Sequence, residues 1–132
     1  MKFDASAPIW VQLVSEFARS IVVGEWAPGS KVPGVRELAA GLGVNPNTAQ
    51  RALAELERQG LCRSERTAGR FVTEDASRIN RVRAELTRDA ADEFIRRAQG
   101  LRMPPDQAQQ LIEERWTAHV DHDQSRTDTG GA

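Results

Sequence analysis

The sequence lacks the features of secreted and membrane-spanning proteins. Its single cysteine, Cys62, excludes an internal disulfide bond and fits a reducing compartment. No apolar run is long enough to span a bilayer, and Asp4 and Pro8 interrupt the apolar core that a signal peptide would need. These absences predict a cytoplasmic protein with no membrane partner.

A strong net charge is also missing. The 132 residues carry 18 lysines and arginines against 19 aspartates and glutamates, so the net charge of −1 gives no indication of a polyanionic partner. The charge is unevenly spread, because residues 36–70 contain six arginines against four glutamates, a surplus of two. Lysine occurs only at Lys2 and Lys31. The composition, 39% hydrophobic and 28% charged, is typical of a globular protein.

The first 75 residues have the element order of a winged helix-turn-helix. Apolar residues at helical spacing predict three helices, over residues 8–23, 35–42 and 46–59. Two short strands, residues 61–63 and 70–73, follow and are joined by a polar turn. Three helices followed by a hairpin, with a tight turn between the second and third helices, predict this DNA-binding fold for residues 1–75.

The remaining pattern is helical as far as Val120. One apolar stripe ends before Gly100, and a second helix begins after Pro105. Because these stripes are too wide for an isolated helix pair, we expect residues 76–120 to form a two-helix dimerisation region. The alternative is that the stripes pack only onto the winged domain of the same chain. Its contact residues are predicted to be Leu86, Phe94, Ile95, Leu111, Ile112 and Trp116. The polar residues 121–132 are expected to be a disordered tail. The predicted fold is thus mainly α, a winged helix-turn-helix followed by two helices.

The start of the third predicted helix carries several short polar side chains. Asn45 or Asn47 can cap the helix, and Pro46 fixes its entry angle. A helix N-terminus favours a phosphate, and the exposed first turns would present Asn47, Thr48, Gln50 and Arg51. Asn and Gln pair with adenine and Arg with guanine, so these side chains suit a recognition helix that enters a DNA groove.

A longer stretch, from Pro8 to Val72, resembles a known family. The sequence PIWVQL…I…G…PGSKVPGVRELAAGLGVNPNTAQRALAELERQGL…GRFV is similar to the winged helix-turn-helix of the GntR family of bacterial transcription regulators. The two-helix C-terminal region, with its closing LIEERW, resembles the YtrA subfamily. The resemblance implies a sequence-specific regulator that represses as a homodimer on a pseudopalindromic operator of double-stranded DNA. It leaves open whether a small-molecule effector, an inducer bound in residues 76–120, releases the DNA.

The same resemblance implies which residues contact DNA. They are Arg36, the start of the third helix at Asn45, Asn47, Thr48, Gln50 and Arg51, and the wing at Gly69 and Arg70. This sequence departs from the family pattern at two positions. Gly34 replaces the usual Ser before RELA, so the second helix loses a side-chain cap. Pro46 replaces an Arg that reads DNA in many members, which shifts base reading toward Asn47, Gln50 and Arg51.

Other functions are weighed against this one. Some relatives carry a pyridoxal-phosphate aminotransferase-like domain, but this length has no room for it, and no nucleophile–base pair is apparent, so we expect no enzyme, catalytic residue or cofactor. In HVDHD, His119 and His122 lie at helical spacing, but a solvated helix end is the simpler interpretation, and no metal is expected. Cys62 is most simply a small buried residue, with a redox switch as the alternative. A winged domain used only for protein contacts is the alternative to DNA binding.

Overall fold

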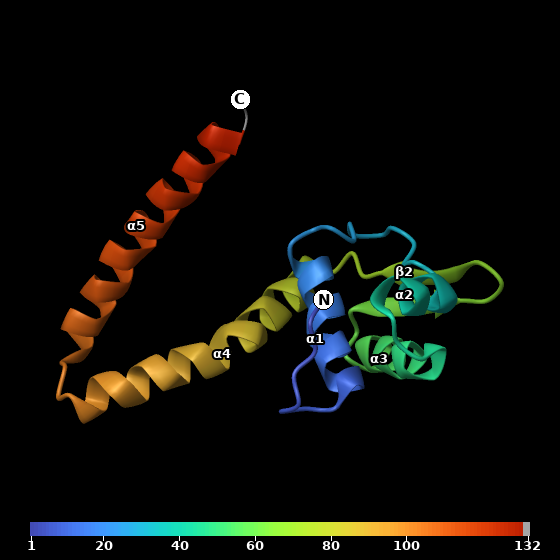
Figure 1. Ribbon diagram of the computed structural model, residues 1–132, viewed down its shortest axis with the longest axis horizontal. Helices are drawn as coiled ribbons and strands as arrows, with labels where there is room; N and C mark the ends of the chain where they lie inside the picture. The colour runs from blue at the N-terminus through green and yellow to red at the C-terminus, as the bar shows by residue number, and fades with distance from the viewer. Residues whose placement is uncertain (131–132) are drawn as a thin grey trace. The chain divides into compact units, whose positions relative to one another are not determined.

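The computed structural model describes the backbone of residues 1–130 and the side chains of residues 1–120 (Figure 1). Its elements, in chain order, are α1 (Ile9–Val22), α2 (Val35–Leu42), α3 (Pro46–Arg58), β1 (Cys62–Glu65), β2 (Gly69–Val72), α4 (Ala76–Gly100) and α5 (Pro105–Gly130). The chain divides into two compact units, Met1–Thr87 and Arg88–Ala132. No helix in the described residues has both the length and the apolar character required to cross a membrane.

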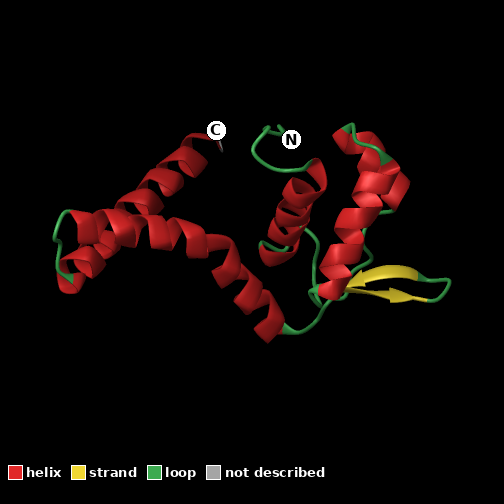
Figure 2. Cartoon of the chain, turned by 90° about the horizontal axis from the view of Figure 1, so that it is seen from below, coloured by secondary structure: helices red, strands yellow, loops and turns green. Residues whose placement is uncertain are grey.

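The first unit is a winged helix-turn-helix, as the sequence predicted. Helices α1 and α2 both pack on α3, and the β1–β2 hairpin follows α3 (Figure 2). Most of the core side chains come from α1, α3, the hairpin and the first turns of α4. The largest fully buried ones are Phe17, Leu13, Ile21, Leu53, Leu56, Leu61 and Val72. Each such burial stabilises the fold by about 1.5–3 kcal/mol, so the packing of α1, α2 and β1 on α3 holds this helix in place.

The turn between α2 and α3 depends on a glycine. Gly43 has φ 69° and ψ 36°, a left-handed conformation that glycine adopts without a steric penalty. The backbone N–H of Val44 then donates to the carbonyl of Ala39 at 3.0 Å. This turn ends α2 after eight residues and lets α3 begin at Pro46, which confirms the tight connection expected from the sequence.

The hairpin is attached to the loop that precedes α2. Strands β1 and β2 are antiparallel, with Cys62 opposite Val72, and β1 continues two residues beyond the predicted strand. Lys31 forms an isolated bridge to Phe71, and the N–H of Val32 donates to the carbonyl of Arg70 at 2.8 Å. The loop therefore fixes the orientation of the wing relative to α2.

The first turns of α4 belong to the winged unit. Ile79 is 8% exposed and Val82 is 2% exposed, and both pack in the core of this unit. Arg83 donates from Nη2 to the carbonyl oxygen of Val22 at 2.9 Å, so α4 also satisfies the C-terminal end of α1. This compact unit continues to Thr87, and its core includes the α4 side chains of Ile79 and Val82. The division of the chain into a DNA-binding domain at residues 1–75 and a dimerisation region at residues 76–120 stays a prediction.

The second unit contains the end of α4 and α5. The N–H of Met103 donates to the carbonyl of Ala98 at 2.9 Å, and Arg102 has a positive φ of 59°, so the chain turns sharply between the helices. Helix α5 has backbone bounds Pro105–Gly130, beyond the predicted helix end at Val120. The disordered tail predicted for residues 121–132 lies outside the residues whose side chains are described, so it stays a prediction.

Candidate nucleic-acid interface

The N-terminus of α3 is capped by Asn45. Its side-chain Oδ1 accepts a hydrogen bond from the backbone N–H of Asn47 at 2.8 Å, and Pro46 occupies the first helical position. The sequence left open whether Asn45 or Asn47 is the cap, and the structure assigns that role to Asn45. Because one Asn45 oxygen is committed to the cap, its amide nitrogen is the part that remains for a ligand.

The two faces of α3 differ as the helical periodicity predicted. Its inner side chains are almost entirely enclosed, and they are Ala49, Ala52, Leu53 and Leu56. On the other side, Asn47, Gln50 and Arg51 are exposed, and Thr48 is half-buried. The structure therefore brings these four predicted site residues together on the first two turns of α3. Their amides, hydroxyl and guanidinium can donate hydrogen bonds to phosphate oxygens or to base edges.

The two arginines of α3 have different partners. Arg58 forms an ion pair with Glu55, one turn earlier in α3, and this contact raises the pKa of the arginine and lowers the pKa of the glutamate to about 2. The guanidinium carbon of Arg51 lies instead 4.0 Å from the centroid of the Trp10 ring. Among the described residues, no carboxylate lies within ion-pair distance of Arg51, so its charge is available to an anion.

Arg36 occupies the second position of α2. Its side chain is exposed, and no ion pair to it is found in the described part of the chain. The preceding Gly34 makes no side-chain capping bond, as expected from the missing Ser. An exposed cation in the first turn of a helix, where free N–H groups also point outward, favours a phosphate.

Gly69, at the start of β2 in the wing, occupies a position where both the backbone conformation and the nearby Lys31 side chain favour a residue without a Cβ. Gly69 has φ 112°, and a Cβ at this position would lie 2.7 Å from Cε of Lys31. The Lys31 side chain therefore lies against the backbone of β2. Sequence reasoning missed Lys31 as a candidate contact, because the Lys31–Phe71 bridge joins segments 40 residues apart and no local pattern indicates it.

Arg70 differs from the prediction in its surroundings. Its Nε donates to Oε1 of Glu57 at 3.0 Å, and only 16% of its side chain is exposed. Ser64 bonds the same carboxylate, and the pKa of Glu57 is lowered by Ser64 first and then by Arg70. Arg70 thus braces the wing against α3, and its predicted role in binding DNA stays a prediction.

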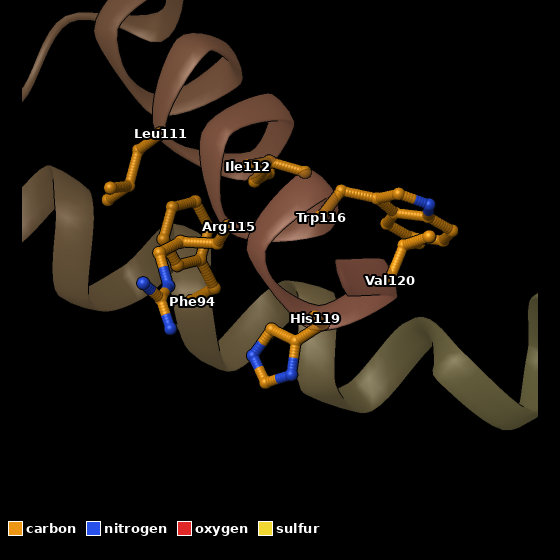
Figure 3. A pocket seen from close by; sticks show the side chains of 7 residues that line it. All are labelled: Phe94, Leu111, Ile112, Arg115, Trp116, His119 and Val120. Atoms are coloured by element: carbon orange, nitrogen blue, oxygen red, sulfur yellow. The ribbon is translucent and has the colours of Figure 1, made fainter. Parts of the chain in front are cut away.

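The predicted dimerisation residues fall in both units. Leu86 is 42% exposed and lies in the winged unit, at the end of the α4 segment packed there. The other five lie in the second unit, where Phe94, Leu111, Ile112 and Trp116 line an open apolar groove of about 560 Å³ together with Arg115, His119 and Val120 (Figure 3). Ile95 lines an adjoining groove of about 530 Å³. Trp116 is 71% exposed, so the described residues leave a large apolar surface uncovered.

The remaining candidate residues show no second site. No group of three metal-ligating side chains occurs among the described residues, and His122 lies outside those whose side chains are described. Cys62 is buried, as expected, and desolvation raises the pKa of its thiol to about 11. The thiol is therefore protonated near neutral pH, which disfavours the alternative of a redox switch.

Comparison with known proteins gives a consistent family. The model of the bacterial regulatory proteins of the gntR family matches residues 11–72. The HTH-type transcriptional regulator YhcF of Bacillus subtilis is 36% identical over 100 residues, which cover 76% of this chain and 83% of that protein. The HTH-type transcriptional repressor YtrA of the same organism is 39% identical over 72 residues, which cover 54% of this chain and 55% of that protein.

Solved structures agree with this result. A GntR family transcriptional regulator from Listeria monocytogenes has a TM-score of 0.74 at 35% identity, covering 85% of this chain and 98% of that one. The DNA-binding domain of AraR, in complex with operator ORX1, has a TM-score of 0.51 at 30% identity, covering 55% of this chain and 93% of that one. With its winged helix-turn-helix and its YtrA-like relatives, the chain belongs to the GntR family of bacterial regulatory proteins, and it is a DNA-binding transcription regulator.

Proposed function

We propose that this regulator represses transcription as a two-fold dimer that binds a pseudopalindromic operator. The observation that carries the proposal is the uncovered apolar surface of the second unit. Ile95 and Ile112 are each 47% exposed and Trp116 is 71% exposed, all within residues 88–120. Burying a large apolar side chain is worth about 1.5–3 kcal/mol, so covering this surface stabilises an assembly substantially.

A second copy of the chain is the occupant that fits best. A two-fold axis lets the same apolar groove serve both partners, with each copy covering the other. The polar groups beside the groove include Arg115 and His119, and the ion pair of Arg96 with Glu93 lies on the same unit, so charges of both signs can surround the contact. The winged unit also carries a single recognition helix, and two copies would read two half-sites.

The exposed N-terminal end of α3 and the cations near it suit two different kinds of DNA contact. Asn47 and Gln50 have exposed amides that can pair with adenine, and within the described residues neither side chain makes a hydrogen bond to another residue. Arg36 and Lys31 are exposed cations beside α2 and the wing, where phosphates of the same groove would lie. We assign base reading to α3 and backbone contacts to α2 and the wing.

Repression and operator binding are supported by relatives. YtrA of Bacillus subtilis is named a transcriptional repressor, and the DNA-binding domain of AraR was solved on an operator. The match to YtrA covers 54% of this chain and the match to the AraR domain covers 55%. These relatives favour a DNA-binding function over a winged domain used only for protein contacts. Release by a small-molecule inducer stays a prediction.

Selection from randomised DNA tests this proposal. The full chain should enrich 30-bp duplexes that contain two inverted half-sites, and a promoter overlapping the enriched site should lose reporter expression when the protein is present. Gln50→Ala should weaken binding by about 1–3 kcal/mol and relax one position of each half-site. Arg36→Ala should instead weaken binding to all duplexes alike and lower the salt slope by about one.

Two results would contradict the proposal. Enrichment of a single half-site, or of no sequence at all, would exclude a dimeric reader of a pseudopalindrome. Increased reporter expression would show that the regulator activates. Glu114→Gln, a change at an exposed position of α5 in the second unit, provides a control that should leave the selected sequence unchanged.

A further inference from the structure

Trp10 contacts the recognition helix from a different element. It is the second residue of α1, its side chain is half-buried, and α1 packs along α3. The guanidinium carbon of Arg51 lies over the Trp10 ring, 4.0 Å from the ring centroid. This distance is well within the range of about 6 Å at which a cation is attracted by an aromatic face.

Stacking and ion pairing leave an arginine in different states. A carboxylate uses the N–H donors of a guanidinium, as Glu55 does with those of Arg58 in the same helix. An indole ring contacts the flat face of the guanidinium and leaves its N–H donors, which lie in the plane, free. Arg51 therefore keeps its full charge and its donors, while its long side chain is restrained.

We propose that Trp10 is a positioning residue that holds the Arg51 guanidinium in the orientation in which it binds DNA. An arginine loses side-chain entropy when it is fixed by a ligand, and a side chain already restrained in the free protein loses less. Trp10 thus raises DNA affinity through Arg51 without contacting the DNA itself. This inference rests on the proposed function, because it requires that Arg51 contacts DNA.

A double-mutant cycle in the full chain tests the inference. The probe is a duplex enriched by the wild-type protein, and the variants are Trp10→Leu, Arg51→Ala and the two combined. Trp10→Leu should weaken binding about fivefold, the loss expected for one exposed cation–π contact. In the Arg51→Ala background the same change should weaken binding by less than about twofold, since no guanidinium remains to be positioned.

Two further variants separate positioning from general stability. Trp10→Phe keeps an aromatic face and should recover most of the lost affinity. Ile9→Ala, at the neighbouring exposed position of α1, should leave affinity unchanged. Thermal melting of each variant is measured in parallel. If Trp10→Leu is unfolded at the assay temperature, the cycle is carried out with Trp10→Phe. This variant should lose about twofold in DNA affinity, and the loss should vanish in the Arg51→Ala background.

The results that overturn the inference differ from those that overturn the proposed function. Equal losses from the Trp10 change with and without Arg51, or an Arg51→Ala variant with wild-type affinity, would show that the stack does not act on DNA binding. Either of these outcomes can be observed only if the wild-type protein binds the enriched duplex. Failure of the wild type to enrich any duplex would instead reject the proposed function.

Discussion

Two residues one helical turn apart on α4 should differ strongly in how much their substitution lowers the stability of the winged unit. Val82 is 2% exposed in the core of the winged unit, whereas Leu86 is 42% exposed. Replacing Val82 by Ala removes about 1.6 kcal/mol of transfer free energy, at ~0.8 kcal/mol for each lost carbon. A residual cavity of about 40 Å³ adds about 1 kcal/mol. The free energy of unfolding should therefore fall by about 2–3 kcal/mol for Val82→Ala and by less than about 0.5 kcal/mol for Leu86→Ala.

Urea and thermal unfolding of a chain ending at Ala91 measure this difference without the second unit. For a domain of this size, each kcal/mol lowers the melting temperature by roughly 4–8 °C, so Val82→Ala should melt at least about 8 °C lower. In the full chain, Leu86→Ala should be the variant with the weaker self-association. Equal unfolding free energies for the two variants would refute the assignment of the first α4 turns to the winged core.

Three further predictions concern the winged unit. Gly69→Ala should weaken DNA binding several-fold and cost about 1–3 kcal/mol of stability, because a side chain at φ 112° is strained and its Cβ would displace Lys31; wild-type behaviour in both assays would contradict this. Asn45→Ala should lower the unfolding free energy by about 1 kcal/mol, and Asn45→Asp should restore most of it, as urea titrations would show. Burial raises the pKa of Cys62 to about 11, from an ordinary value near 9, so the thiol ionises first in the unfolded chain and the free energy of unfolding should fall as the pH rises from about 9 to 11. Iodoacetamide at pH 8 should label Cys62 much faster in urea than in the native protein. Equal labelling rates would show that the thiolate is accessible in the native protein.

Local patterns predicted much of the winged unit from the sequence. The buried face of α3 followed from helical spacing, and the short polar side chains beside Pro46 predicted a cap by Asn45 or Asn47, of which the structure shows Asn45. The turn at Gly43 followed from the residue that a left-handed conformation favours. In each case the determining interactions lie within a few residues along the chain, so the sequence alone contains them.

Contacts between distant segments could not be predicted in the same way. The apolar stripe of α4 is continuous, and periodicity does not show that Ile79 and Val82 pack in the winged core while Ile95 stays exposed. The ion pair of Arg70 with Glu57 and the stack of Arg51 on Trp10 join different elements. Arginine and glutamate are common on exposed surfaces, so only the three-dimensional arrangement distinguishes an arginine paired with Glu57 from one available to DNA.

Sedimentation of the full chain with and without the enriched duplex tests the two-fold dimer most directly. At micromolar concentration the free protein should sediment as a dimer, and the complex should contain two chains per duplex. Trp116→Asp should give a monomer that binds the same duplex far more weakly, because a charge would be buried at the apolar contact. A full-length monomer that still binds the two inverted half-sites tightly would contradict the account.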